Sequence, residues 1–154
     1  MNKDEILTHL REAKLAHKNW VQKAKLLIEG FKVEKDAIPV NATSCEFGCW
    51  FYKEAQKLNA LRNNPLECMQ NIEEYHSRLH TIYLNIFKIY YSHYEANFLQ
   101  KLFGTKRKVT STEKEIAISH YEEIEAVSKQ LIDELNRMER RIIALGDAEI
   151  EKIK

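Results

Sequence analysis

Glycine and proline are scarce in this sequence, with 4 Gly and 2 Pro among 154 residues. Sandwiches and barrels of β-strands need many turns, where these two residues are common, so the scarcity argues against both folds. No uncharged apolar run approaches the roughly 18 residues of a membrane span, and we expect no membrane insertion. The 3 cysteines are an odd number, which excludes a complete set of internal disulfides.

Neither sign of charge dominates the chain, which has 24 basic and 23 acidic residues and a formal net charge of +1. This balance gives no overall field that would attract nucleic acid or an anionic membrane, and we expect no nucleic-acid partner. Hydrophobic residues make up 44% of the chain, enough for a packed core. Length and composition predict one soluble domain over residues 1–154, located in the reducing cytoplasm.

Apolar residues recur at steps of three and four, the spacing of one helical face, between the few Gly and Pro residues. The pattern predicts an all-α chain, an antiparallel four-helix bundle with a long loop between its first and second helices. We expect helices at about residues 6–30, 44–61, 65–103 and 112–146, followed by a tail at 147–154. Capping boxes predict that Thr43 and Thr112 begin the second and fourth helices.

Two histidines, His76 and His80, stand four residues apart in the third predicted helix. This spacing places both imidazoles on one face, where they can reach one metal ion. Such a pair also arises by chance, and both positions fall on the expected core face. His17 lies on the apolar face of the first helix, three residues before Trp20, and taken alone it is more typical of a hydrogen-bonded core histidine.

The segment Cys-Glu-Phe-Gly-Cys-Trp, residues 45–50, begins the second predicted helix. The free N–H groups at a helix start favour a thiolate at Cys45, and the thiolate is the form that binds zinc. Gly48 costs about 1 kcal/mol relative to Ala inside a helix, which a close approach of another backbone or a ligand would explain. We expect Trp50 to shield such a site, and Cys49 to be either a filler or a resolving thiol for oxidised Cys45.

In combination these motifs resemble the chemoreceptor zinc-binding (CZB) domain, a family found on bacterial chemoreceptors and on some diguanylate cyclases. The resemblance rests on His-x-x-Trp, Cys-x-Phe-Gly-x-Trp and His-x-x-x-His, in that order along the chain. The matching residues are His17, Trp20, Cys45, Phe47, Gly48, Trp50, His76 and His80. The motif-bearing part covers about residues 7–104.

The resemblance implies one Zn²⁺ per chain, bound by His17, Cys45, His76 and His80. Three imidazoles and one thiolate suit a closed tetrahedral site, which leaves no position for an activated water and argues against an enzyme. The resemblance also implies a free-standing bacterial sensor that forms a homodimer and signals to a chemotaxis or cyclic-di-GMP signalling protein. Zinc occupancy or oxidation of Cys45 would change the helix packing that this partner recognises.

Two other functions stay open. The fourth helix favours a structural coiled-coil module, since its apolar residues form a continuous seam. This seam comprises Ile124, Val127, Leu131, Leu135, Met138, Ile142 and Leu145. A hemerythrin-like di-iron bundle also uses His-x-x-x-His and would recruit His93 or His120, but the sequence shows no complete set of acidic partners for it.

Overall fold

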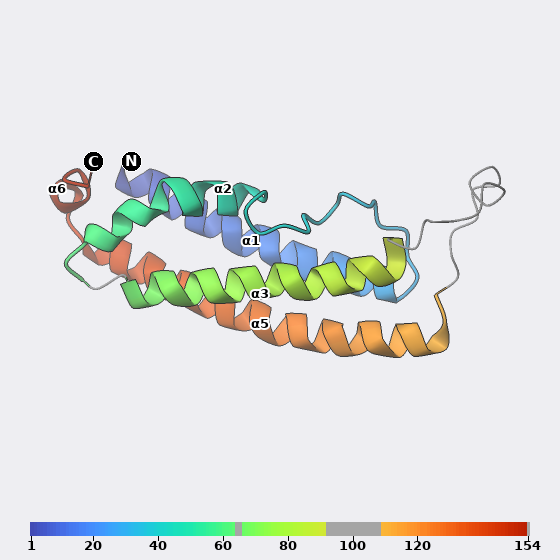
Figure 1. Ribbon diagram of the computed structural model, residues 1–154. Helices are drawn as coiled ribbons and strands as arrows, with labels where there is room; N and C mark the ends of the chain where they lie inside the picture. The colour runs from blue at the N-terminus through green and yellow to red at the C-terminus, as the bar shows by residue number, and fades with distance from the viewer. Residues whose placement is uncertain (64–65, 92–108, 154) are drawn as a thin grey trace.

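The computed structural model describes residues 1–63, 66–91 and 109–153 (Figure 1). Within these ranges the chain forms helices and no strand, which confirms the predicted all-α class. The helices are α1 (Lys3–Ile28), α2 (Glu46–Lys53), the 3-10 helix η1 (Ala55–Ala60), α3 (Leu66–Tyr91), α5 (Ser111–Ala144) and α6 (Asp147–Ile150). Among the described helices, none combines the length and the hydropathy that a membrane span requires.

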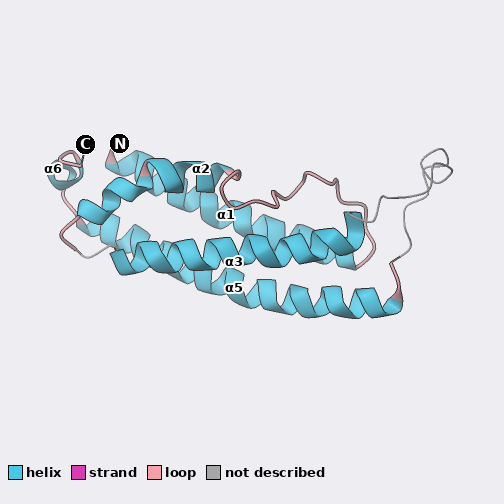
Figure 2. Cartoon of the chain, viewed as in Figure 1, coloured by secondary structure: helices cyan, strands magenta, loops and turns pink. Residues whose placement is uncertain are grey.

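Three long helices, α1, α3 and α5, lie along one another, and α5 packs against both of the others. The helices α1 and α3 run in the same direction and α5 runs in the opposite one (Figure 1). The short helix α2 contacts α1 and is followed by η1. Residues 29–45 join α1 to α2 without helix, and Figure 2 shows this segment as a long loop.

The core forms where the apolar faces of these helices meet. All seven predicted seam residues are buried, from Ile124 in α5 to Leu145, its C-cap. The predicted inner faces of α1 and α3 are likewise buried at positions such as Leu10 and Ile86. Phe31 differs, with 61% of its surface exposed. The helix α1 has ended by then, because Gly30 at φ 96° closes a turn in which the Phe31 N–H donates to the Leu26 carbonyl.

The start of α2 differs from the prediction. Thr43 does not cap this helix, because its hydroxyl and backbone N–H both donate to the Asn41 side chain. Cys45 is the N-cap instead, and its sulfur accepts a hydrogen bond from the Gly48 N–H at 3.2 Å. The predicted second helix over residues 44–61 is therefore two shorter ones, α2 and η1.

The start of α5 is also shifted from the predicted capping box. Thr110, not Thr112, is the N-cap, and Glu113 completes the box by accepting from the Thr110 N–H. The short helix α6 takes up part of the predicted tail at 147–154. The predicted start of the third helix at Pro65 and its continuation through residues 92–103 to Gly104 lie outside the described residues, as does His93.

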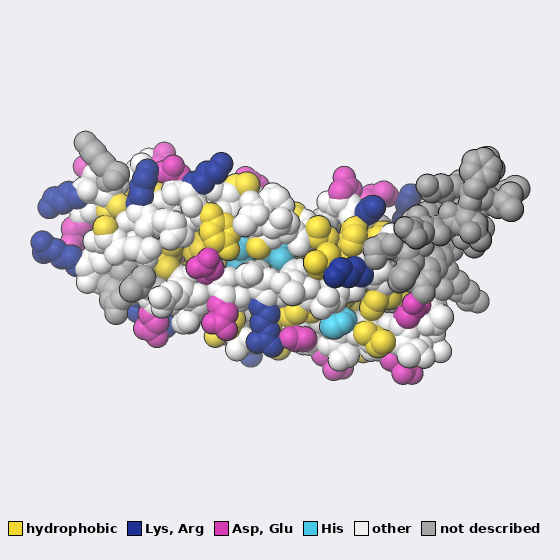
Figure 3. Space-filling model, in the orientation of Figure 1, with side chains coloured by type: hydrophobic (Ala, Val, Ile, Leu, Met, Phe, Trp, Pro, Cys, Tyr) yellow, Lys and Arg dark blue, Asp and Glu magenta, His cyan; other side chains and the backbone are white. Residues whose placement is uncertain are grey.

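Polar contacts join α1 to α5 along the edge of the core. Lys14 and Arg11 on α1 both pair with Glu139 on α5. Lys3 donates to the carbonyls of Ile143, in the last turn of α5, and of Leu145, its C-cap. On the face shown in Figure 3, side chains of both charge signs are interspersed, in keeping with the near-zero net charge.

Candidate metal centre

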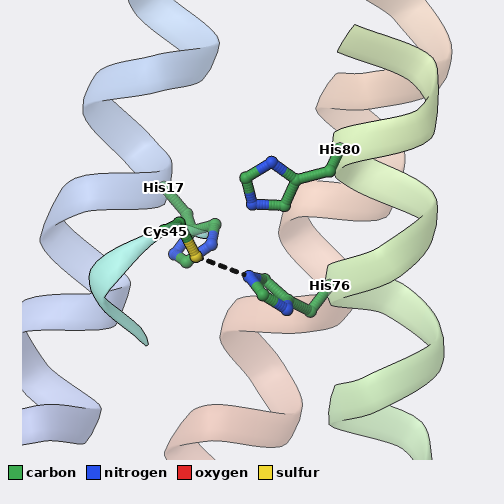
Figure 4. Close-up of side chains that lie close together, drawn as sticks. All are labelled: His17, Cys45, His76 and His80. Carbon is green, nitrogen blue, oxygen red and sulfur yellow. Dashed lines mark hydrogen bonds between the residues drawn. The ribbon is translucent and has the colours of Figure 1, made fainter. Parts of the chain in front are cut away.

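Four of the predicted site residues meet at one point inside the protein. His17 comes from α1, Cys45 from the start of α2, and His76 and His80 from α3 (Figure 4). One ligand atom from each lies within 4.8 Å of the other three. No side chain in this group is more than 1% exposed. Three elements thus deliver three imidazoles and one thiol to a buried point.

Backbone carbonyls orient two of the imidazoles. His17 Nδ1 lies 2.6 Å from the Ala13 carbonyl oxygen, and His80 Nδ1 lies 2.7 Å from that of Pro39. A carbonyl oxygen can only accept, so both Nδ1 atoms carry the proton and both Nε2 atoms keep a lone pair. Each of these Nε2 atoms is buried and has no hydrogen-bond partner. This is the tautomer in which histidine binds a metal through Nε2.

The third imidazole faces the thiol. His76 Nε2 lies 3.2 Å from Cys45 Sγ, and His76 Nδ1 is buried without a partner. Leaving a buried polar nitrogen unpaired costs about 1–3 kcal/mol, and the unpaired Nε2 atoms of His17 and His80, beside the Cys45 sulfur and His76 Nε2, call for a common partner. A divalent cation among the four groups would satisfy the lone pairs that no protein donor reaches.

Burial keeps the three imidazoles neutral. It lowers the pKa of His17 to about 4 and the pKa of His76 to about 2, from the usual 6.5. Burial also lowers the pKa of His80, and the hydrogen bond to the Pro39 carbonyl offsets part of that shift. Because a metal binds the neutral imidazole, the folded chain presents these ligands in the competent form across the neutral pH range.

The Cys45 thiol behaves differently from the sequence-based expectation. Burial raises the pKa of Cys45, and the Gly48 N–H that donates to its sulfur lowers the pKa by less. The prediction of a thiolate at this helix start is therefore wrong for the metal-free chain, because desolvation raises the pKa of Cys45 by more than the N–H groups of the helix start lower it. Zinc supplies the positive charge that deprotonates a coordinating thiol.

Aromatic rings line the cluster. Trp20 packs edge-on against His17 and His80, with ring centroids 4.5 and 5.5 Å apart. Phe47 packs edge-on against His17 at 5.8 Å and His76 at 5.1 Å. Trp50 reaches the site through Phe47 and stacks on His9 at 4.7 Å. These rings exclude water from the ligands and fix the planes of the imidazoles.

The close approach predicted at Gly48 is confirmed. A Cβ atom at Gly48 would lie 1.8 Å from the Ala42 carbonyl oxygen. The same carbonyl accepts the Cys45 thiol at 3.4 Å. Gly48 therefore lets the chain before α2 fold back onto the helix start, which points the Cys45 sulfur into the cluster.

Sequence reasoning missed the backbone groups that hold the site. The carbonyls of Ala13, Pro39 and Ala42 contact ligand side chains, and a carbonyl leaves no residue-type signature in a sequence. The sequence signal nearest to these carbonyls is Pro39, which marks a non-helical segment but does not indicate which side chain its carbonyl contacts. Cys49 lies one turn after Cys45, exposed, with its thiol 3.5 Å from the Thr43 carbonyl and outside the four-residue cluster.

Comparison with known proteins agrees with this geometry. A family model described as the chemoreceptor zinc-binding domain matches residues 17–86, a range that begins at His17 and includes Cys45, His76 and His80. The match lies within the motif-bearing part predicted at 7–104. The searches of curated proteins and of solved structures give no match. Residues 17–86 thus match a zinc-binding domain family, and the four-residue cluster within them is fit for its cofactor, Zn²⁺.

Proposed function

We propose that the chain is a regulatory zinc-binding module whose single zinc ion is held by His17, Cys45, His76 and His80. The observation that carries the proposal is the buried meeting of three neutral imidazoles and one thiol, with lone pairs that no protein donor reaches. Four protein ligands leave no open position for an activated water, and this supports a binding role rather than an enzymatic one.

Zinc in this position would join three elements that are otherwise lightly connected. Its ligands come from α1, α2 and α3, so binding free energy contributes to their packing. The regular antiparallel four-helix bundle, with α2 and η1 together as its short second helix, is part of this proposal. A loss of zinc would then alter the helix arrangement, which is the output that we propose.

Elemental mass spectrometry on protein purified without added metal tests the proposal. We expect about one zinc per chain in the parent and a clear loss in Cys45→Ala, while His120→Ala keeps the metal because His120 lies outside the cluster. Absence of zinc from the parent would favour the structural coiled-coil module. Two irons per chain would favour the hemerythrin-like alternative.

Oxidation of Cys45 is the proposed redox input. Hypochlorite would transfer its oxygen to the zinc-bound thiolate and leave as chloride, and the resulting sulfenate is a poorer zinc ligand. Condensation of the protonated sulfenic acid with the exposed Cys49 thiol would form a disulfide and release water. Zinc release measured with a chromophoric chelator tests this input. Cys49→Ser is expected to bind zinc normally and, after excess hypochlorite, to recover less zinc binding when a thiol reductant is added. The reductant reverses the disulfide of the parent, whereas the unprotected sulfenate of the variant oxidises further to a sulfinate that a thiol does not reduce.

The remaining parts of the proposal concern partners. The match to a chemoreceptor zinc-binding domain is the support for a homodimer in the bacterial cytoplasm that reports to a chemotaxis or cyclic-di-GMP signalling protein. Light scattering on the zinc-loaded and zinc-free chains tests the dimer. A mass of one chain in both forms would contradict it.

A further inference from the structure

The segment over residues 29–45, here called the strap, leaves the end of α1 and returns to the metal centre at Cys45 (Figure 1). We propose that Pro39 is a positioning residue for the ligand His80, and that the strap is the element whose order depends on zinc. The inference rests on the proposed function, because it requires zinc at the four-residue cluster.

The strap contacts the cluster at two points. The Pro39 carbonyl accepts from His80 Nδ1 at 2.7 Å, and the Ala42 carbonyl accepts from the Cys45 thiol at 3.4 Å. The second bond requires the thiol proton, which zinc displaces, so the His80 contact carries the coupling to zinc. Between these points and α1, Ile38 inserts into the core with 2% of its surface exposed. When a metal fixes the orientation of the His80 ring, it also fixes the direction of the hydrogen bond that Nδ1–H donates to the Pro39 carbonyl.

The rest of the strap is held by few interactions in the described part of the chain. Tyr91 near the end of α3 donates its hydroxyl to the Val33 carbonyl at 2.8 Å. Lys23 reaches the Ala37 carbonyl at 3.5 Å, and the Lys35 ammonium lies over the Phe87 ring of α3, 5.7 Å from its centroid. Within the strap itself the backbone bonds found are two single turns, at Ala37 and at Ser44. A segment with so few bonds opens at low free-energy cost, so losing the His80 contact has a large effect on it.

Coupling between two sites is reciprocal, which gives the inference a second consequence. If zinc binding favours the ordered strap by a given factor, the ordered strap favours zinc binding by that same factor. A hydrogen bond that stabilises the ordered strap should therefore increase zinc affinity. The hydrogen bond from the Tyr91 hydroxyl to the Val33 carbonyl is the best one to test. It binds the strap to α3, and Tyr91 is not one of the four cluster residues.

Limited trypsin digestion of the full chain tests zinc-dependent order. Lys32 and Lys35 are exposed sites within the strap, and Lys129 is an exposed site within α5. We expect cleavage after Lys32 and Lys35, identified by mass spectrometry, to become about tenfold faster when a chelator removes zinc. Cleavage after Lys129 is expected to change much less. Equal strap cleavage with and without bound zinc would overturn the inference while leaving the zinc site intact, whereas a chain that binds no zinc would overturn the proposed function as well.

A matched pair of tyrosine variants tests the reciprocal effect. We expect Tyr91→Phe to weaken zinc binding about fivefold in a competition titration, the value of one hydrogen bond. Tyr121→Phe removes a hydroxyl bond within α5, to Glu125. Tyr121 lies near Glu29, where the strap leaves α1, but its hydroxyl bonds to α5 and not to the strap, so this variant is expected to bind zinc as the parent does. Unchanged affinity in Tyr91→Phe would contradict the coupling of strap and metal.

Discussion

Gly48 is the single residue at which the smallest change should disturb the metal centre most. In Gly48→Ala the new methyl group would meet the Ala42 carbonyl, a backbone atom that cannot rotate away. We expect a loss of about 1–3 kcal/mol in the free energy of unfolding, together with weaker zinc binding because Cys45 shifts. Denaturant unfolding and zinc titration measure the two effects.

Gly146→Ala is the matched control for this substitution. Gly146 has a φ of −72°, and the nearest atom to a Cβ there, Glu149 Oε2, is 3.9 Å away. The free energy of unfolding of Gly146→Ala is expected to stay within about 0.5 kcal/mol of that of the parent. Equal effects of the two substitutions would contradict the close approach at Gly48.

At the residue scale, the sequence allowed the cluster to be predicted but not its supports. His76 and His80 share a helical face by spacing alone, while His17 and Cys45 joined them only through the family resemblance. The distances that bring α1 and α2 to α3 depend on packing, which local spacing does not encode. The ionisation of Cys45 was mispredicted because burial, the dominant cause of its raised pKa, is a tertiary property.

At the element scale, the apolar seam of α5 should dominate stability. Leu131 is fully buried, so Leu131→Ala is expected to cost about 2–5 kcal/mol through lost burial and a cavity. Ile116→Ala on the same helix should cost less than about 1 kcal/mol, because Ile116 is already 47% exposed. Urea unfolding of both variants measures the difference, and comparable losses would argue against α5 as the core helix.

Element boundaries show what periodicity can and cannot predict. The α5 seam followed from its regular spacing, and all of its predicted members are buried. The start of α2 did not follow from the sequence pattern. Thr43 has Glu46 three residues later, as a capping box requires, but Cys45 occupies the N-cap position instead. The Thr43 hydroxyl donates to the Asn41 side chain and does not cap the helix. The Cys45 sulfur caps it by accepting from the Gly48 N–H.

At the scale of the whole molecule, buried neutral histidines should make the metal-free chain acid-sensitive. Their pKa values are lowered in the folded state, so below pH 6.5 the unfolded chain binds protons that the folded chain does not. The free energy of unfolding should therefore fall as pH drops from 7 to 5, by up to about 1.4 kcal/mol per pH unit for each buried histidine.

Denaturant unfolding of the metal-free chain at several pH values measures this slope. His76→Leu removes one of the buried histidines and should reduce it. The window lies above the ordinary pKa of carboxylates, so Glu139, whose pKa its pairing with Lys14 lowers, adds little there. A stability that does not change between pH 7 and pH 5 would contradict the burial of neutral imidazoles.

X-ray absorption spectroscopy at the zinc edge tests the central claim most directly, because it counts the ligand types on the bound metal. The account predicts one sulfur at about 2.3 Å and three nitrogens at about 2.0–2.1 Å in the parent, with the sulfur shell absent in Cys45→Ala to which excess zinc has been added back. A parent spectrum without sulfur, or with more than one, would contradict a site built from His17, Cys45, His76 and His80.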